Sequence, residues 1–127
     1  MKTILVTGAL GQIGTELTVF LRERYGEDNV IASGLKESTE PAIRDVGHFH
    51  FVDVTQPEQI ADVVRKHKVD TIFHLAALLS AKGEAKPQAA WIVNMGGTYN
   101  VLEVARVFGC AVFTPSSIAA FGPDTPR

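Results

Sequence analysis

Three glycines behind a short apolar run constrain the fold more than any other feature of this chain. Gly8, Gly11 and Gly14 occupy every third position in the stretch VTGALGQIG. Glycine inside a helix or strand costs roughly 0.5–1 kcal/mol relative to alanine, so three of them in seven residues indicate a special backbone task. Because a β-rich segment precedes them and helical spacing follows them, we expect a tight turn from a strand into a helix.

The rest of the chain alternates short apolar segments with segments of helical periodicity, which is typical of βαβ units. The expected strands are residues 2–7, 29–33, 48–54, 69–75 and 110–116. We therefore predict a Rossmann-type α/β fold, a doubly wound parallel sheet in strand order 3-2-1-4-5 with helices on both faces and right-handed crossovers.

The helices are predicted from periodicity and from their end signals. The first ends at Gly26, the second begins at a capping box from Thr55 to Glu58, and the third runs from Pro87 to Gly109. Close packing against a neighbouring backbone is the expected reason for Gly96 and Gly97 inside the third helix. In the first helix, Ile13, Leu17, Phe20 and Leu21 predict the core face, and Glu16, Arg22, Glu23 and Arg24 predict the solvent face.

Composition narrows the class of protein. The 127 residues predict one domain, and the net charge of −2 with dispersed basic residues argues against nucleic acid as a partner. The single cysteine, Cys110, excludes an internal disulfide and is expected to be a small core residue in a reducing compartment. No apolar run is long enough to span a membrane, so we expect a cytoplasmic protein.

The four histidines raise the question of a metal site. His48 and His50 are expected to share one strand face, but no cysteine or carboxylate cluster joins them at ligand spacing. His74 is expected to be a packed strand residue. We predict no metal.

The glycine turn predicts a dinucleotide site. Gly8 allows the tight turn, Gly11 lets the backbone approach a pyrophosphate, and Gly14 lets helix and strand pack closely. The first helical residues, Gln12 and Ile13, offer free N–H groups to the phosphates. The alternative is a turn with a structural role only.

Four further stretches extend the pattern: FVDVT, FHLAA, VNMGGTYNVLEVA and PSSIAAFG. With the Gly-x-x-Gly-x-x-Gly spacing, they make the chain resemble the extended short-chain dehydrogenase/reductase superfamily, which contains nucleotide-sugar epimerases and dehydratases. The resemblance implies that Asp53 and Val54 lie against the adenine and that Leu75, Ala76 and Ala77 line the path of the nicotinamide ribose. It also implies that Asn94 supports the active site, and for Asp53 the alternative is a strand-end turn residue.

Two segments, HLAALLSAKGE and PSSIAAFGPDTP, are most similar to the epimerase-type L-threonine 3-dehydrogenases, which oxidise L-threonine to 2-amino-3-ketobutyrate with NAD. That resemblance implies that Ser117 is the active-site hydroxyl and that Ser80 contacts the bound amino acid. The family's Tyr-x-x-x-Lys pair has no match, because Asn29 and Glu103 stand four residues after the two tyrosines. We therefore expect residues 1–127 to be the truncated nucleotide-binding half of such an enzyme, inactive as this chain alone.

The end of the second strand departs from the expected pattern. An acidic residue about 20 positions past the glycines usually binds the adenosine ribose, whereas this chain has Gly34 there, followed two residues later by Lys36. Gly34 is expected to leave space and Lys36 to bring charge, so a 2′-phosphate could be accommodated. We expect NAD as the cofactor, with NADP as the alternative.

Two other functions stay open. One is a fragment of a nucleotide-sugar epimerase or dehydratase, which shares the glycines and the serine-containing loop. The other is a short, non-catalytic nucleotide-binding module. A module of this kind would have to cover the surfaces that a second half buries, so we expect it to self-associate, and the family resemblance implies a homodimer.

Overall fold

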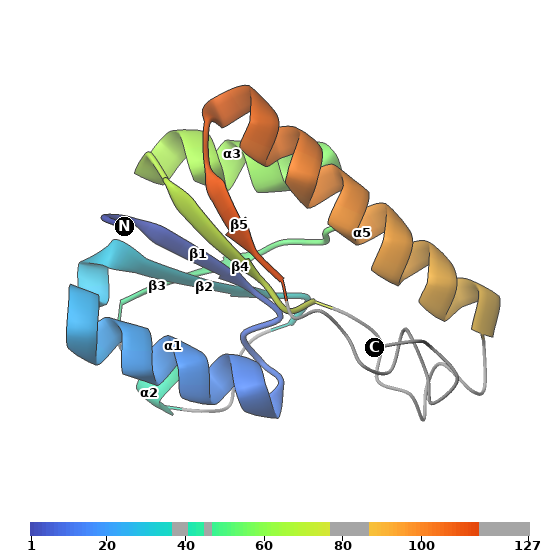
Figure 1. The fold of residues 1–127 in the computed structure, drawn as a ribbon. Coiled ribbons are helices and arrows are strands. Elements are labelled where there is room, and N and C mark those ends of the chain that lie inside the picture. Colours follow the sequence, from blue (N-terminus) through green and yellow to red (C-terminus); the bar gives the residue numbers. More distant parts are fainter. Residues whose placement is uncertain (37–40, 45–46, 77–86, 115–127) are drawn as a thin grey trace, which may run out of the picture.

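A parallel five-stranded sheet forms the centre of the molecule (Figure 1). The computed structural model describes residues 1–36, 41–44, 47–76 and 87–114. All paired strands run parallel in the order β3-β2-β1-β4-β5, which confirms the predicted topology. The strands are β1 (Ile4–Thr7), β2 (Val30–Gly34), β3 (His48–Phe51), β4 (Thr71–His74) and β5 (Ala111–Phe113).

The helices cover both faces of this sheet, as predicted. They are α1 (Gln12–Tyr25), the 3₁₀ turn η1 (Glu27–Asn29), α2 (Pro41–Arg44), α3 (Pro57–His67) and α5 (Pro87–Phe108). Figure 1 shows α1 and α2 on one face and α3 and α5 on the other. No helix of the described ranges is long and apolar enough to cross a membrane.

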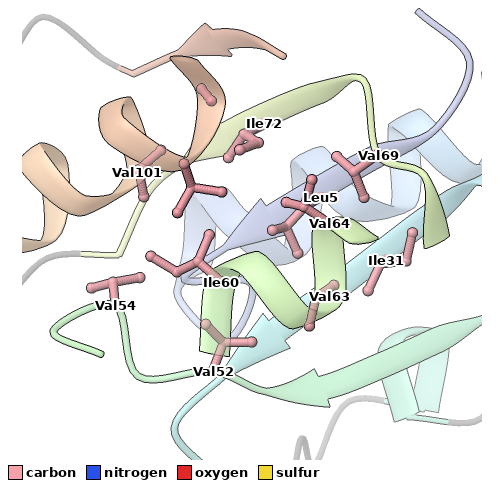
Figure 2. Packing of buried hydrophobic residues seen from close by; sticks show 12 residues of the cluster. Leu5, Ile31, Val52, Val54, Ile60, Val63, Val64, Val69, Ile72 and Val101 are labelled. Carbon is pink, nitrogen blue, oxygen red and sulfur yellow. The ribbon is translucent and has the colours of Figure 1, made fainter. Parts of the chain in front are cut away.

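Successive residues of the central strands belong to two separate hydrophobic clusters, because side chains along a strand alternate between the two faces of the sheet. Leu5, Ile31 and Ile72 point toward α3 and α5 (Figure 2). Ile4 and Val6 belong to the cluster on the α1 face. Because both faces of β1 are covered, Ile4, Leu5 and Val6 are all fully buried.

The core face of α1 differs from the predicted one. The side chains of Ile13 and Phe20 are 70% and 56% exposed, so the prediction is wrong for these two residues. Leu21 is buried and Leu17 packs against the same cluster, as predicted, and the other buried residues of the helix are Gly14, Thr18 and Arg22. The Thr18 hydroxyl donates to the Gly14 carbonyl at 2.6 Å, which satisfies this buried polar group within the helix. The helix therefore turns Gly14, Thr18 and Arg22 toward the sheet beside Leu17 and Leu21, and leaves Ile13 and Phe20 exposed.

Arg22, predicted on the solvent face, is buried and joins three elements. Its Nη2 donates to the carbonyls of Val30 and His48 at 3.2 and 2.7 Å, and its Nη1 donates to the Ile43 carbonyl at 3.4 Å. Burial lowers the pKa of the guanidinium, although the Glu27 carboxylate partly opposes that shift. A planar group with five donors can satisfy several carbonyls that a hydrophobic residue would leave unpaired.

Replacing this group with an amine tests its role. We expect Arg22→Lys to destabilise the chain by about 1–2 kcal/mol, because one ammonium cannot reach the carbonyls of Val30, Ile43 and His48 together. Urea unfolding measures the change, and Arg24→Lys is the matched control on the exposed side of the same helix. Equal stability of the two variants would contradict the structural role of Arg22.

The predicted capping box at Thr55 does not form. The N-cap of α3 is Gln56, without a side-chain cap, and Pro57 occupies the first helical position, where proline is favoured. The Thr55 hydroxyl donates instead to Asp53 Oδ1 at 2.6 Å. The preceding turn therefore uses the threonine that the sequence pattern assigned to the helix.

The paired glycines of α5 have different environments. A Cβ on Gly97 would lie 2.7 Å from Val54 Cγ2, so α5 packs closely there, although against a side chain and not against the predicted backbone. A Cβ on Gly96 would meet no atom of the described residues within 4 Å, so the predicted packing is not seen there within that part of the chain. The helix stops before Gly109, whose φ of 73° suits glycine at such an end.

Candidate functional site

The turn between β1 and α1 packs directly on the end of β4. Gly8 has a φ of +70°, and a Cβ there would lie 2.7 Å from both the Leu75 carbonyl carbon and the Ala76 nitrogen. Both the conformation and the space therefore require glycine. The glycine loop and Leu75–Ala76 are brought together at the carboxyl edge of the sheet, where ligands of open α/β sheets bind.

Gly14 closes the other side of this turn. A Cβ at this position would lie 2.1 Å from the Gly8 carbonyl oxygen and 2.8 Å from the Ala9 Cα. Since both neighbours are backbone atoms, no side-chain rotation can relieve the overlap. The predicted role of Gly14 in close packing is seen in the contact of α1 with the turn itself.

Gly11 is different from its two partners. Its φ of −72° is open to any residue, and a Cβ would meet only the Gly8 oxygen, at 3.6 Å. Nothing within the described part of the chain therefore demands glycine at position 11. A side chain absent from an exposed helix N-cap leaves the backbone open to an approaching ligand.

The N-terminus of α1 is suited to an anion. Gly11 provides no side-chain cap, and the first turn carries no acidic residue. The N–H groups of Gln12, Ile13 and Gly14 have no acceptor within the helix, as at every helix start. With the positive end of the helix dipole, these donors can hold a phosphate group.

A hydrogen-bond network that the sequence reasoning missed lies below the glycine loop. The Thr7 hydroxyl oxygen accepts from the N–H groups of Leu75 and Ala76 at 3.0 and 3.2 Å. It lies 2.8 Å from Nδ1 of the buried His74. Because both lone pairs of the hydroxyl are engaged, its proton goes to His74 Nδ1, which requires a neutral imidazole.

Burial acts in the same direction and lowers the pKa of His74 to about 4. Thr7 and His74 thus position the Leu75–Ala76 backbone against Gly8. The pairing of β1 with β4 places Thr7 opposite His74, and no spacing in the sequence marks this register.

The end of β2 is tied to the glycine loop. The Ala9 N–H donates to the Ser33 carbonyl at 2.9 Å, and the Ser33 hydroxyl donates to the Val6 carbonyl at 2.8 Å. The position of a Cβ on Gly34 lies 2.8 Å from Cδ1 and Cγ of Leu10. The expectation that Gly34 leaves open space is therefore wrong, because the Leu10 side chain fills it.

Asp53 and Val54 follow β3 in a tightly bonded turn. Asp53 Oδ1 accepts from the N–H and hydroxyl of Thr55 at 2.9 and 2.6 Å, and the Asp53 N–H donates to Gln59 Oε1 at 2.8 Å. The Val54 carbonyl accepts from Asn100 Nδ2 at 2.9 Å. Asp53 is thus a turn residue, its adenine contact stays a prediction, and Asn100 is a positioning residue that sequence reasoning missed.

The other predicted site residues are only partly visible. Asn94 lies half-buried on α5, and its carbonyl accepts from the Thr98 hydroxyl at 2.8 Å. Ala77, Ser80 and Ser117 lie outside the described residues. Their roles stay predictions.

Three histidines meet between β3 and α3. His50 Nε2 and His67 Nε2 are 2.8 Å apart, and the ring centroid of His48 is 4.8 Å from that of His67. Burial lowers the pKa of both His50 and His67, and neighbouring Lys66 acts in the same direction. Across the described ranges, no group of three or more histidine, cysteine, aspartate or glutamate residues is arranged to hold a metal ion.

Comparisons with known proteins agree with this geometry. The sequence model of the NAD dependent epimerase/dehydratase family matches residues 4–127. An uncharacterized epimerase/dehydratase of Staphylococcus saprophyticus is 52% identical over 127 residues, which are 100% of this chain and 40% of that protein. The chain therefore spans about 40% of the length of the curated relatives that it matches.

The fold is also similar to those of solved structures. The X-ray structure of L-threonine dehydrogenase from Clostridium difficile has a TM-score of 0.93 and 52% sequence identity, over 100% of this chain and 40% of that chain. A UDP-glucose-4-epimerase from Stenotrophomonas maltophila with bound NAD has a TM-score of 0.81 at 22% identity, over 96% of this chain and 39% of that one. At this lower identity the likeness concerns the fold alone.

Proposed function

Because the chain belongs to the NAD-dependent epimerase/dehydratase family, we propose that residues 1–127 form the NAD-binding part of an oxidoreductase that acts on L-threonine. The observation that carries the proposal is the glycine turn. Gly8 and Gly14 are required by close backbone contacts, whereas Gly11 is left bare at an exposed helix N-terminus. A pyrophosphate bound there accounts for a glycine that internal packing does not explain.

The remaining cofactor contacts follow from this placement. Gly11, Gln12 and Ile13 offer their N–H groups to the pyrophosphate. The Asp53–Val54 turn lies at the carboxyl edge toward β3, where it would meet the adenine. Leu75 and Ala76 lie at the end of β4 and would follow the nicotinamide ribose, a role proposed also for Ala77, while Asn94 would support the site from α5.

The substrate assignment rests on the likeness to L-threonine dehydrogenases. NAD, when bound, supplies the hydride acceptor for oxidation of the threonine alcohol to a ketone. Ser117 is proposed to hydrogen-bond that alcohol and Ser80 to contact the amino acid. Neither Tyr25 nor Tyr99 has a lysine four residues later, so the chain alone lacks the family's proton-transferring pair.

Binding and turnover are therefore expected to separate. Calorimetry with NAD should give saturable binding to this chain, whereas L-threonine plus NAD should give no NADH. Absence of NAD binding would overturn the cofactor proposal, and NADH production by this chain would overturn the role assigned to the missing pair.

Gly11→Asp provides the sharpest variant. The carboxylate caps α1 without strain, so thermal stability should be unchanged or higher. The same negative charge faces the pyrophosphate, so NAD affinity should fall by roughly a hundredfold or more. Gly11→Ser is the matched neutral control, and equal loss of affinity in both variants would point to steric rather than electrostatic exclusion.

Two alternative functions rank behind the proposed one. The likeness to the epimerase supports only the shared fold, so a nucleotide-sugar epimerase or dehydratase ranks behind the dehydrogenase. A non-catalytic nucleotide-binding module would bind NAD without any downstream chemistry. Joining the chain to the remainder of a threonine dehydrogenase or of an epimerase, and measuring both activities, separates these functions.

Self-association is part of the same proposal. Met95, Tyr99 and Leu102 are exposed at helical spacing along one stripe of α5. An apolar stripe of this kind suits contact with a second copy or with another part of a longer protein.

A further inference from the structure

We propose that the ribose end of this site does not discriminate against a 2′-phosphate, so that NADP binds within about tenfold of NAD. The inference rests on the proposed dinucleotide function and extends it to the choice of cofactor. Three features carry it: the absence of a carboxylate at the end of β2, the residue that takes its place, and the charge beside it.

The first feature is the position of Gly34. It is the last residue of β2, pairs with Phe51 of β3, and lies 20 residues past Gly14. A carboxylate at this position normally accepts from the ribose 2′-OH of NAD. The same negative charge repels a 2′-phosphate, so one residue supplies both the preference for NAD and the exclusion of NADP.

The second feature is the packing of Leu10 on Gly34. A Cβ at position 34 would lie 2.8 Å from two carbon atoms of the Leu10 side chain. An aspartate therefore cannot stand at position 34 while Leu10 keeps this position. The glycine and the leucine form a complementary apolar pair where other dinucleotide sites place an acid.

The third feature is charge. Lys36 is exposed two residues beyond Gly34 and has no ion-pair partner among the described residues. The carboxylate that follows the neighbouring strand is Asp53, whose Oδ1 already accepts two hydrogen bonds from Thr55. A flexible ammonium close to a 2′-phosphate offsets the negative charge of the phosphate. The same ammonium adds little binding free energy at an uncharged 2′-hydroxyl.

Titration calorimetry of this chain with NAD and with NADP tests the proposal. Dissociation constants within tenfold of each other support it. NAD binding with a more than tenfold weaker NADP overturns it while leaving the proposed function intact. Failure of both dinucleotides to bind instead overturns the proposed function on which the inference rests.

Paired variants connect the result to the named residues. The double variant Gly34→Asp with Leu10→Ala removes the collision and adds the acid, so NADP should weaken by a hundredfold or more while NAD binding persists. Leu10→Ala alone adds no charge and should keep the ratio within tenfold. Lys36→Gln should weaken NADP by about three- to tenfold and NAD by less than twofold.

Melting curves by circular dichroism verify that each variant is folded. An unchanged NADP affinity in the folded double variant would contradict the role of position 34. An equal effect of Lys36→Gln on both cofactors would contradict the role of the ammonium.

Discussion

Gly14→Ala is expected to abolish detectable NAD binding and to destabilise the chain by about 3 kcal/mol. The added methyl group would lie 2.1 Å from the Gly8 oxygen and 2.8 Å from the Ala9 Cα, so α1 must move away from the turn. That movement displaces the N–H groups of Gln12 and Ile13 from the position in which they face a phosphate. Urea unfolding and calorimetry with NAD measure the two effects.

Gly96→Ala is the matched control, because it makes the same substitution in a helix where a Cβ would meet no atom of the described ranges within 4 Å. Relief of the poor helix propensity of glycine should stabilise α5 by up to about 1 kcal/mol. NAD affinity should not change. A Gly14→Ala variant as stable as the parent and equally able to bind NAD would contradict the close approach of α1 to the turn.

The strand order could be predicted from the sequence because the pattern is redundant. Five short apolar segments separated by helical periods leave few parallel arrangements once crossovers must be right-handed. Each observed strand falls within its predicted range except for Gly34, which extends β2 by one residue. The register could not be predicted, and it is the register that places Thr7 opposite His74.

The core face of α1 was predicted correctly at Leu17 and Leu21 but wrongly at Ile13 and Phe20. Ile13 and Phe20 lie beside the true core stripe, which starts one residue later at Gly14. The helix must approach the turn so closely that only glycine fits at its first contact. Arg22 then enters the core because carbonyls of other elements need donors there, a demand that a single helix does not reveal.

The glycines of the candidate site could be predicted from the sequence, whereas the residues that position its backbone could not. Gly8 and Gly14 follow from a motif whose physical reasons are local to the turn. Thr7, His74 and Asn100 act through partners 46 or more residues away, and no short spacing marks them. Leu10 is likewise unmarked by any motif, and its packing at Gly34, 24 residues later, changes the interpretation of the β2 end.

Acidification from pH 7 to pH 4 is expected to remove about 3 kcal/mol of stability through His74 alone. The pKa of His74 falls from 6.5 to about 4 in the folded chain because the ring is buried. Between pH 6.5 and pH 4, His74 is therefore mostly protonated in the unfolded chain and mostly neutral in the folded chain. The stabilisation is complete above pH 6.5 and is lost progressively as the pH falls toward 4.

The hydrogen-bond geometry gives an independent reason for the same sign. Nδ1 of His74 faces a hydroxyl oxygen that already accepts from Leu75 and Ala76. A protonated ring would place a third donor against that oxygen, and the Thr7 hydroxyl proton would lose its acceptor. The Leu75–Ala76 backbone beside Gly8 would then be released, so NAD affinity should weaken over the same pH range.

His74→Asn isolates this effect, because the asparagine oxygen can accept the Thr7 proton and does not titrate. His50 and His67 also have lowered pKa values and act in the same direction, so the comparison requires His67→Asn as a second variant. Urea unfolding between pH 4 and pH 8 should show a flatter profile for His74→Asn, with most of the slope retained in His67→Asn. A pH profile of His74→Asn as steep as that of the parent would mean that protonation of His74 does not destabilise the fold. The Thr7 hydroxyl would then not donate its proton to His74 Nδ1.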